Sequence, residues 1–285
     1  MRILLTGSSG WLGSALAPRL RALGHEVIGL DPVPSFETQM IGSIADRDLV
    51  MRVVGGNRIE AIIHSGSLHK PNIESRANSD FVATNVQGTL NLLDAAVATG
   101  VQRFVFTSTT SLMISQAIRD GFKDGARKAA WLTEAMSPEP RNIYGVTKLS
   151  AEHLCRLYHL QHDLPVVMLR TARFFPEADD MAHAIEQSDA NSKANEFLFR
   201  RLTVEDAAQA HIAALEKAPQ LGVLYHGLLE VILHAARGDR EYLAGEVAAP
   251  PLLELARRLE VGAVLADAFP QLRDVLAPHR LGEHD

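Results

Sequence analysis

Tyr144 and Lys148 have the residue types and the spacing of a proton-transfer pair. They stand four residues apart in a segment with helical periodicity, so both side chains emerge on one face of the helix. A tyrosine in water has a pKa of about 10, which makes it a poor base at neutral pH, but a neighbouring ammonium favours the phenolate. Such a tyrosine can take a proton from a substrate hydroxyl or return one. A hydroxyl at the carboxyl end of a strand completes the group, and the run 104–109 supplies one in Thr109.

Three glycines near the start of the chain have a spacing that suits a phosphate cradle. Gly7, Gly10 and Gly13 follow the short apolar run 2–6 and lead into a helical pattern over 11–23. Gly7 permits a sharp turn, Gly10 lets the backbone approach a pyrophosphate, and Gly13 lets the helix pack closely on the strand. The helix N-terminus then presents N–H groups and a positive dipole end to the phosphates.

Asp31 indicates which dinucleotide this cradle would hold. It ends the second apolar run, 18 residues after Gly13, where a carboxylate accepts hydrogen bonds from the adenosine ribose. The same carboxylate repels a 2′-phosphate, so NAD is favoured over NADP. Together with Tyr144 and Lys148, the cradle predicts an enzyme that moves hydride with NAD.

Strands and helices alternate over the first part of the chain, as in a Rossmann-type α/β fold with a doubly wound parallel sheet. We expect an NAD-binding domain over 1–175 and a small C-terminal substrate lobe over 176–285, with helix 203–217 packing back on the first domain. The expected strands are 2–6, 24–31, 60–66, 101–108, 164–170 and 221–226. The expected helices are 11–23, 46–54, 76–99, 144–161, 203–217, 228–237, 250–260 and 268–276.

Composition argues against several classes of function. The chain has 285 residues, 47% of them apolar, and a net charge of −6, with no basic patch for nucleic acid and no polybasic run for a membrane surface. No run approaches the roughly 18 apolar residues of a membrane span. Cys155 is the only cysteine, so no disulfide forms within the chain. We expect a cytoplasmic protein with a small-molecule substrate, no nucleic-acid partner, no membrane contact and no metal.

These residues lie in longer runs that resemble the extended short-chain dehydrogenases/reductases, the NAD-dependent epimerase/dehydratase family. The resemblance covers roughly residues 1–217. The similar runs are T-G-S-S-G-W-L-G at 6–13, I-I-H-S-G-S-L-H-K-P at 62–71, N-V-Q-G-T-L-N-L-L at 85–93, F-V-F-T-S-T at 104–109, Y-G-V-T-K at 144–148, L-R-T at 169–171 and V-E-D-A-A-Q-A-H at 204–211.

The resemblance implies a catalytic site and a set of cofactor contacts. Thr109, Tyr144 and Lys148 would be the catalytic residues, with Ser108 beside them, and Asn85 would order the backbone of the active site. Tyr144, Lys148, Asp31 and the three glycines are also expected to contact NAD. The further cofactor contacts that the resemblance implies are Ser9, Trp11, Leu12, Ser43, Ile44, Gly66, Ser67, Asn85, Thr107 and Thr171.

Departures from the family pattern bear on the substrate. Thr110 and Ser111 stand where the family's 4,6-dehydratases carry Asp-Glu, which argues against water elimination. Arg173 replaces an asparagine, and it either holds a carboxylate or phosphate of the substrate or pairs with acidic residues at the surface. Glu134 is similar to the family's acidic position before the tyrosine. The substrate candidates are His69, Thr110 and Arg173, and His69 fits a solvated loop equally well.

The sequence thus predicts an NAD-dependent dehydrogenase, reductase or epimerase that acts at a carbinol of a sugar-like or nucleotide-sugar substrate. Phe199 stands where many nucleotide-sugar epimerases carry an arginine, which slightly favours dehydrogenase or reductase chemistry. The alternative is a non-catalytic dinucleotide-binding or sensing protein on the same fold, which the unusual Ala/Leu-rich tail over 230–285 would fit. By resemblance we also expect a homodimer, joined by a four-helix bundle of helices 76–99 and 144–161.

Overall fold

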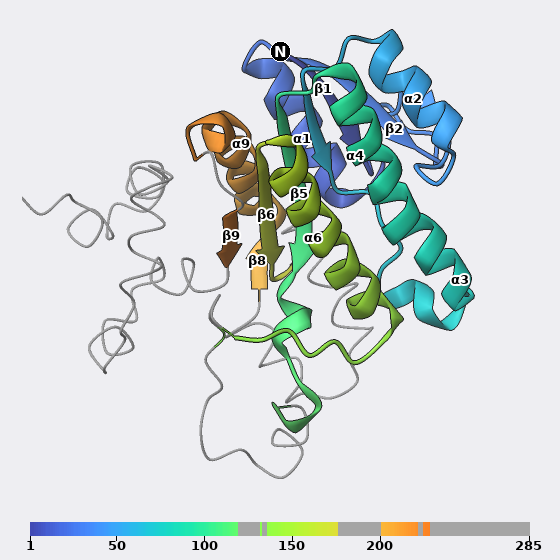
Figure 1. Ribbon diagram of the computed structural model, residues 1–285, viewed down its shortest axis with the longest axis vertical. Helices are drawn as coiled ribbons and strands as arrows, with labels where there is room; N and C mark the ends of the chain where they lie inside the picture. Colours follow the sequence, from blue (N-terminus) through green and yellow to red (C-terminus); the bar gives the residue numbers. More distant parts are fainter. Residues whose placement is uncertain (119–131, 133–135, 176–200, 222–224, 229–285) are drawn as a thin grey trace, which may run out of the picture.

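Seven parallel strands form the central sheet of the computed structural model, which describes residues 1–118, 132, 136–175, 201–221 and 225–228 (Figure 1). Their order across the sheet is β3-β2-β1-β4-β5-β6-β9, so the strand order reverses at β1. This is the predicted Rossmann-type arrangement. The strands are β1 (Arg2–Thr6), β2 (Glu26–Asp31), β3 (Met40–Ile41), β4 (Ala61–His64), β5 (Arg103–Thr109), β6 (Val166–Thr171) and β9 (Tyr225–Leu228).

Helices cover both faces of this sheet, which confirms the doubly wound fold. One face carries α1 (Trp11–Ala22) and α9 (Val204–Leu221). The other face carries α2 (Arg47–Gly56), α4 (Gly88–Thr99) and α6 (Ile143–His162) (Figure 1). Because both faces are covered, the central strands are apolar along nearly their whole length, without the alternation of a half-exposed sheet.

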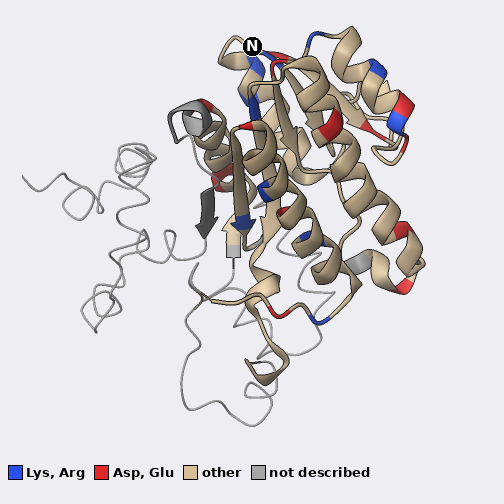
Figure 2. Cartoon of the chain, in the orientation of Figure 1, with Lys and Arg blue, Asp and Glu red and all other residues tan. Residues whose placement is uncertain are grey.

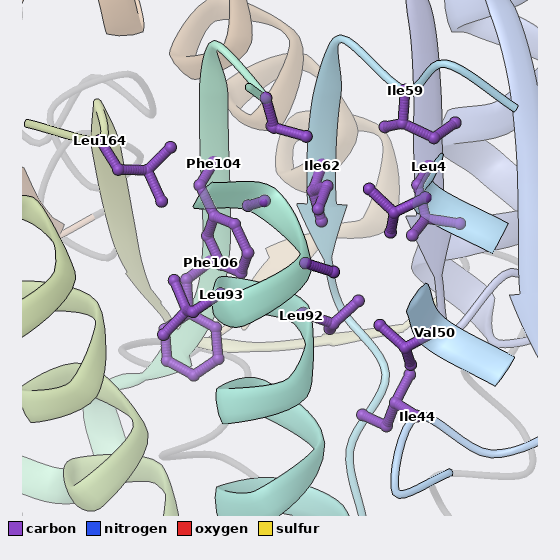
Figure 3. Close-up of a cluster of buried hydrophobic side chains, with 14 of the residues drawn as sticks. Leu4, Ile44, Val50, Ile59, Ile62, Leu92, Leu93, Phe104, Phe106 and Leu164 are labelled. Carbon is purple, nitrogen blue, oxygen red and sulfur yellow. The ribbon is translucent and has the colours of Figure 1, made fainter. Parts of the chain in front are cut away.

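Alternating side chains along each strand divide the core into two layers. Leu4 of β1, Ile62 of β4 and Phe104 of β5 lie on the face covered by α2 and α4, where Val50 and Leu92 meet them (Figure 3). Their strand neighbours point to the opposite face, because successive residues of a strand alternate. Each fully buried apolar side chain of this kind stabilises the fold by roughly 1.5–3 kcal/mol.

The helix predicted over 76–99 is interrupted by a wider turn. α3 (Asn78–Phe81) passes into the π-helical segment η2 (Val82–Gln87), and α4 follows without a break. α4 ends at Gly100, whose φ of 76° is a left-handed conformation that favours glycine. A π-helical turn inserted in a helix often marks a functional position, and this one contains Asn85.

α6 has defined ends and one buried side. Asn142 caps its start by accepting a hydrogen bond from the backbone N–H three residues later, at 2.9 Å. Asp163, in a left-handed conformation, ends it. Lys148, Glu152 and Cys155 are buried at helical spacing, so this side of α6 faces the sheet.

Two elements beyond residue 175 are joined to the sheet. β9 pairs with β6, and α9 packs against α1 and β5. A separate pair of short strands is formed by β7 (Arg173–Phe175) and β8 (Arg201–Thr203). The domain division at residue 175 stays a prediction. Leu228, the first residue of the helix predicted at 228–237, is instead the last residue of β9. The rest of that helix and the helices predicted at 250–260 and 268–276 lie outside the described residues.

Neither sign of charge dominates among the described residues drawn in Figure 2. Lys and Arg are interspersed with Asp and Glu over the helices (Figure 2). Among the described helices, none has both the length and the apolar character needed to cross a membrane.

Candidate active site

The loops after β1 and β4 lie against each other where the strand order reverses. Gly7 has a φ of 74°, and a Cβ there would lie 2.7 Å from the backbone N of Gly66. Gly66 N donates to the Thr6 side chain at 3.1 Å, and Ser65 Oγ donates to the Thr6 carbonyl at 2.7 Å. Open α/β sheets bind ligands in the crevice at this point. The structure therefore brings the predicted residues Gly7 and Gly66 together there.

The glycines of the first loop have two different surroundings. A Cβ at Gly13 would lie 2.3 Å from the Gly7 carbonyl oxygen, so glycine is needed there for packing within the protein. A Cβ at Gly10 would meet only that same oxygen, at 3.4 Å, so the protein leaves room above Gly10. No side chain caps the N-terminus of α1. Trp11 is half exposed and Leu12 is buried. Open space and uncapped N–H groups fit a dinucleotide pyrophosphate.

Asp31 lies at the carboxyl end of β2, beside this loop. Its two carboxylate oxygens accept hydrogen bonds from Ser9 N at 3.4 Å and from Val33 N at 2.8 Å. Each carboxylate oxygen has a second lone pair for a further donor. The arrangement fits ribose hydroxyls, which donate hydrogen bonds, and disfavours a phosphate.

The loop after β3, with the predicted residues Ser43 and Ile44, is fastened to α4. Asn91, fully buried, donates from its amide to the Ile44 carbonyl at 2.9 Å and to the Ala45 carbonyl at 3.1 Å. Ser43 Oγ accepts from Ala45 N at 3.1 Å. Sequence reasoning missed Asn91, although a buried asparagine within an apolar helical stripe signals a specific hydrogen-bond partner.

Thr109 and Tyr144 meet at the carboxyl end of β5. Burial raises the pKa of Tyr144 to about 12, and the neighbouring Thr109 hydroxyl opposes that shift. Thr109 also accepts a hydrogen bond from Ser111 N at 3.2 Å, which starts the 3₁₀ turn η3 (Thr110–Met113). The two predicted catalytic hydroxyls are thus adjacent, and this tyrosine needs a nearby positive charge to act as a base.

Lys148 lies one turn beyond Tyr144, on the buried side of α6. Its Nζ donates to the Thr107 carbonyl at 2.5 Å and lies 4.0 Å from the centre of the Phe106 ring. Burial lowers the lysine pKa to about 7, and the negative charge of Glu152 opposes that shift. The charge of the predicted lysine therefore depends on its surroundings.

A buried ion pair, which sequence reasoning missed, lies next to this lysine. Arg170 Nε and Nη2 donate to the two Glu152 oxygens at 2.9 Å and 2.7 Å, and Ser108 Oγ donates to the same carboxylate at 2.5 Å. Both charged side chains are buried. The available signals were the carboxylate four residues after Lys148, and an arginine within the apolar strand V-V-M-L-R-T.

Asn85 lies at the middle of a chain of buried polar side chains. Its amide exchanges hydrogen bonds with the Leu68 backbone and donates to Thr147 Oγ1 at 3.0 Å. Thr89 donates to the Asn85 carbonyl at 2.6 Å, and His64 lies between the side chains of Thr89 (3.0 Å) and Thr6 (2.7 Å). This chain connects Thr6, at the end of β1, with Thr147 of α6, and the ordering role expected of Asn85 stays a prediction.

Two further predicted cofactor residues turn out to be internally bonded. The Thr107 hydroxyl is 2.7 Å from Nε2 of His211, on α9, and only its carbonyl faces Lys148. Thr171 Oγ1 donates to the Ser108 carbonyl at 3.1 Å and is buried. Side-chain contact of either residue with a cofactor stays a prediction.

The substrate candidates are spread over different environments. His69 is exposed at the start of the 3₁₀ turn η1 (Lys70–Glu74), while Thr110 is buried at the start of η3. Arg173 begins β7, and Ser67 is partly buried in the loop after β4. Glu134 lies outside the described residues.

A family model and several individual proteins are similar to this chain. The model of the NAD dependent epimerase/dehydratase family matches residues 3–224. The NAD-dependent glucose-6-phosphate dehydrogenase of Haloferax volcanii is 30% identical over 179 residues, which are 59% of this chain and 66% of that protein. The uronate dehydrogenase of Pseudomonas syringae pv. tomato is 29% identical over 183 residues, 62% of this chain and 60% of that protein. The chain thus spans 60–66% of the length of these two relatives.

A solved structure supports the fold. The UDP-glucose 4-epimerase of Thermus thermophilus, in complex with NAD, has a TM-score of 0.64 and 23% sequence identity, and the match covers 81% of this chain and 78% of that one. At this identity the likeness concerns the fold alone. NAD, the cofactor expected from Asp31, is the cofactor in the description of the matching family.

Proposed function

This chain belongs to the NAD dependent epimerase/dehydratase family, and from that premise we propose that it oxidises a carbinol of a sugar-like substrate, with Tyr144 as the acid/base. One observation carries the proposal. The Thr109 and Tyr144 side chains are neighbours at the carboxyl end of β5, with Lys148 one helical turn behind. The glycine loop, which leaves open space at Gly10, also follows the carboxyl end of a strand, β1, of the same parallel sheet.

The residues that would hold NAD are distributed over the ends of three strands, β1, β2 and β3, and over helix α6. The N–H groups of α1 and the open face of Gly10 suit the pyrophosphate, while Asp31 suits the adenosine ribose. The loop of Ser43 and Ile44 would face the adenine, and Lys148 the nicotinamide ribose. When bound, NAD supplies the group that accepts a hydride and returns it.

Proton transfer would be the work of the protein's own side chains. Tyr144 would take the proton of the substrate hydroxyl, with Thr109 holding that hydroxyl in line. The phenolate this requires is favoured by the Lys148 ammonium, since an opposite charge nearby lowers a tyrosine pKa. In the reverse direction Tyr144 would return the proton to the carbonyl oxygen.

The form of the reaction that we favour is dehydrogenation of a sugar that carries no nucleotide. The dehydrogenases among the relatives are named for glucose 6-phosphate and for uronate, both of which are anionic sugars. Arg173, at the start of β7, is a cation that could hold such an anionic group. Epimerases are also among the relatives, and an epimerase would regenerate oxidised NAD in every turnover.

The proposal is tested by assaying the protein with NAD and three substrates: glucose 6-phosphate, glucuronate and UDP-glucose. A dehydrogenase accumulates reduced nicotinamide, whereas an epimerase interconverts the sugars without net reduction. The Tyr144→Phe variant is expected to lose at least about 100-fold in turnover, the scale of a lost acid/base, with NAD affinity retained. Undiminished turnover in this variant would refute the role of Tyr144. NAD binding without turnover of any sugar would favour the non-catalytic alternative.

We also propose a homodimer joined by a four-helix bundle, in which each copy supplies α6 and the helix predicted over 76–99, made up of α3, η2 and α4. Three apolar side chains on α6 support this, because they are exposed although the other side of the helix is buried in the core. They are Val146 (47% exposed), Leu157 (43%) and Leu160 (68%).

A further inference from the structure

We propose that Glu152 is a positioning residue that raises the charged fraction of the Lys148 side chain at neutral pH. The importance of that charge for catalysis rests on the function proposed above. The charge itself is a property of the chain alone, so it can be tested separately.

The geometry places both side chains in one buried layer. Lys148 and Glu152 are one turn apart on α6, 2% and 3% exposed, and face β5. Lys148 Nζ bonds a backbone carbonyl and lies over the Phe106 ring. Neither contact supplies a full negative charge, and an ammonium out of water without one is costly. The carboxylate of Glu152 is the charge that this layer provides.

Three hydrogen-bond donors hold Glu152 in a fixed position. Arg170 binds its two oxygens in a bidentate pair at 2.9 Å and 2.7 Å, and Ser108 donates to it at 2.5 Å. A carboxylate accepts all three hydrogen bonds, whereas a protonated carboxyl group would bring a competing donor. The guanidinium thus fixes the anion one turn from Lys148.

The other titratable groups around Lys148 do not supply this negative charge. Burial raises the pKa of the Cys155 and Tyr144 side chains, which keeps both neutral at neutral pH. Burial and the charge of Lys148 itself lower the pKa of His64, which is then neutral as well. Among the described residues that face Lys148, Glu152 is therefore the only anion, and Arg170 is the second cation.

The test is a titration of lysine side chains by nuclear magnetic resonance in the full chain labelled at lysine Cε. The Lys148 signal is assigned by its loss in a Lys148→Met variant. Its midpoint in the wild type is expected at about pH 7. In Glu152→Gln, which keeps the shape of the side chain, the midpoint should fall by at least about one pH unit. Glu152→Asp keeps the negative charge on a shorter side chain. In this variant the Lys148 midpoint should fall much less.

Glu152→Gln leaves the Arg170 guanidinium without a carboxylate and could prevent folding. A double variant, Glu152→Gln with Arg170→Met, removes both charges together and avoids that stranded cation. The midpoint of Lys148 should still fall, by less than in the single variant. An unchanged midpoint in whichever of these neutral variants folds would overturn the proposal.

Turnover adds a second readout if the proposed function holds. The loss of activity in Glu152→Gln relative to the wild type should increase with pH up to about pH 7, because over this range the lysine of the variant loses its proton before that of the wild type does. A purely structural role for Glu152 predicts the same loss at every pH. Failure of NAD to bind would refute the proposed function and leave the shift of the Lys148 midpoint to be judged by the resonance titration.

Discussion

At the scale of single residues, the contacts of Asp31 predict the choice of dinucleotide. Its oxygens already accept two backbone hydrogen bonds, from Ser9 and Val33, which fix the carboxylate at the end of β2. Asp31→Asn keeps the shape but removes the charge that repels a 2′-phosphate. We expect the preference for NAD over NADP to fall by at least about tenfold, which corresponds to about 1.4 kcal/mol. Calorimetric titrations of the wild type and of Asp31→Asn with NAD and NADP measure the ratio of the two affinities.

An unchanged ratio would mean that another residue selects the nucleotide. Val33→Ala serves as a matched control. The substitution keeps the backbone N–H of residue 33 that donates to Asp31, and it changes only an exposed side chain that should not affect nucleotide binding. The control is expected to keep the preference of the wild type.

Individual site residues were predictable where spacing along the chain carries the chemistry. Tyr144 and Lys148 share a helix face, so their proximity follows from four residues of separation, and Thr109 follows from its place at a strand end. Glu152 and Arg170 could not be paired in this way, because the two residues lie on different elements. Their meeting depends on how α6 lies across β5 and β6, which no local pattern fixes.

At the scale of elements, the segment that joins β1 to α1 predicts that replacing one glycine lowers stability, whereas replacing another lowers NAD affinity. Gly13→Ala would place a Cβ 2.3 Å from a backbone oxygen, so the free energy of unfolding should fall by about 1–3 kcal/mol. Gly10→Ala meets only one atom, at 3.4 Å, so stability should change by less than about 1 kcal/mol. NAD affinity should nevertheless fall at least about tenfold in Gly10→Ala, because the new methyl group occupies the space for the pyrophosphate. Denaturant unfolding and calorimetry separate the two quantities.

Loss of stability without loss of NAD affinity in Gly10→Ala would contradict this assignment of the cradle. Gly24→Ala is a useful comparison, because that glycine also has open space around it but lies at the other end of α1. Its φ of 82° predicts a cost in stability and no direct effect on NAD.

The contact between α9 and β5 predicts a dependence of stability on acid. His211 Nδ1 bonds the Ala207 carbonyl and Nε2 meets Thr107, and burial lowers the pKa of this histidine to about 4. The unfolded chain binds the proton near pH 6.5. Between these values the unfolded state holds more protons, so stability falls as pH drops from about 6.5 to about 4, by up to about 1.4 kcal/mol per unit.

Replacing this histidine tests the assignment. His211→Gln should be less stable at pH 7 but should show a shallower loss of stability over the same pH range. Chemical denaturation at several pH values gives both slopes. Equal slopes for the two proteins would rule out His211 as a source of the acid sensitivity.

The elements themselves were largely predictable, because apolar runs and glycines mark their ends. The π-helical segment at 82–87 was not, since it leaves the apolar pattern of 76–99 intact and shows only in the backbone. Its position depends on contacts of Asn85 with Leu68 and Thr147, which are distant in sequence.

At the scale of the whole molecule, the exposed apolar face of α6 predicts association. A second copy would bury Leu157 and Leu160, at about 25 cal/mol for each Å² of apolar surface. Leu160→Glu should therefore shift the protein from dimer to monomer in analytical ultracentrifugation, with the fold intact by circular dichroism. Leu23→Glu, on an exposed position at the end of α1, is the matched control and should leave the mass unchanged. A monomeric wild type would contradict the proposed dimer.

The general architecture of the molecule was predictable, because alternating strands and helices allow few topologies. The number of strands in the sheet was harder to predict from the sequence. β9 lies beyond the expected boundary at residue 175, yet it pairs with β6 as the last strand of the sheet. A short strand that follows a helix carries no local sign of which sheet it joins.

Calorimetric titration of the wild-type protein with NAD and NADP, after any co-purified nucleotide has been removed, tests the central claim most directly. We predict micromolar or tighter binding of NAD and much weaker binding of NADP. Absence of binding by either nucleotide to the empty, folded protein would contradict the assignment of the cradle, and with it the proposed hydride chemistry.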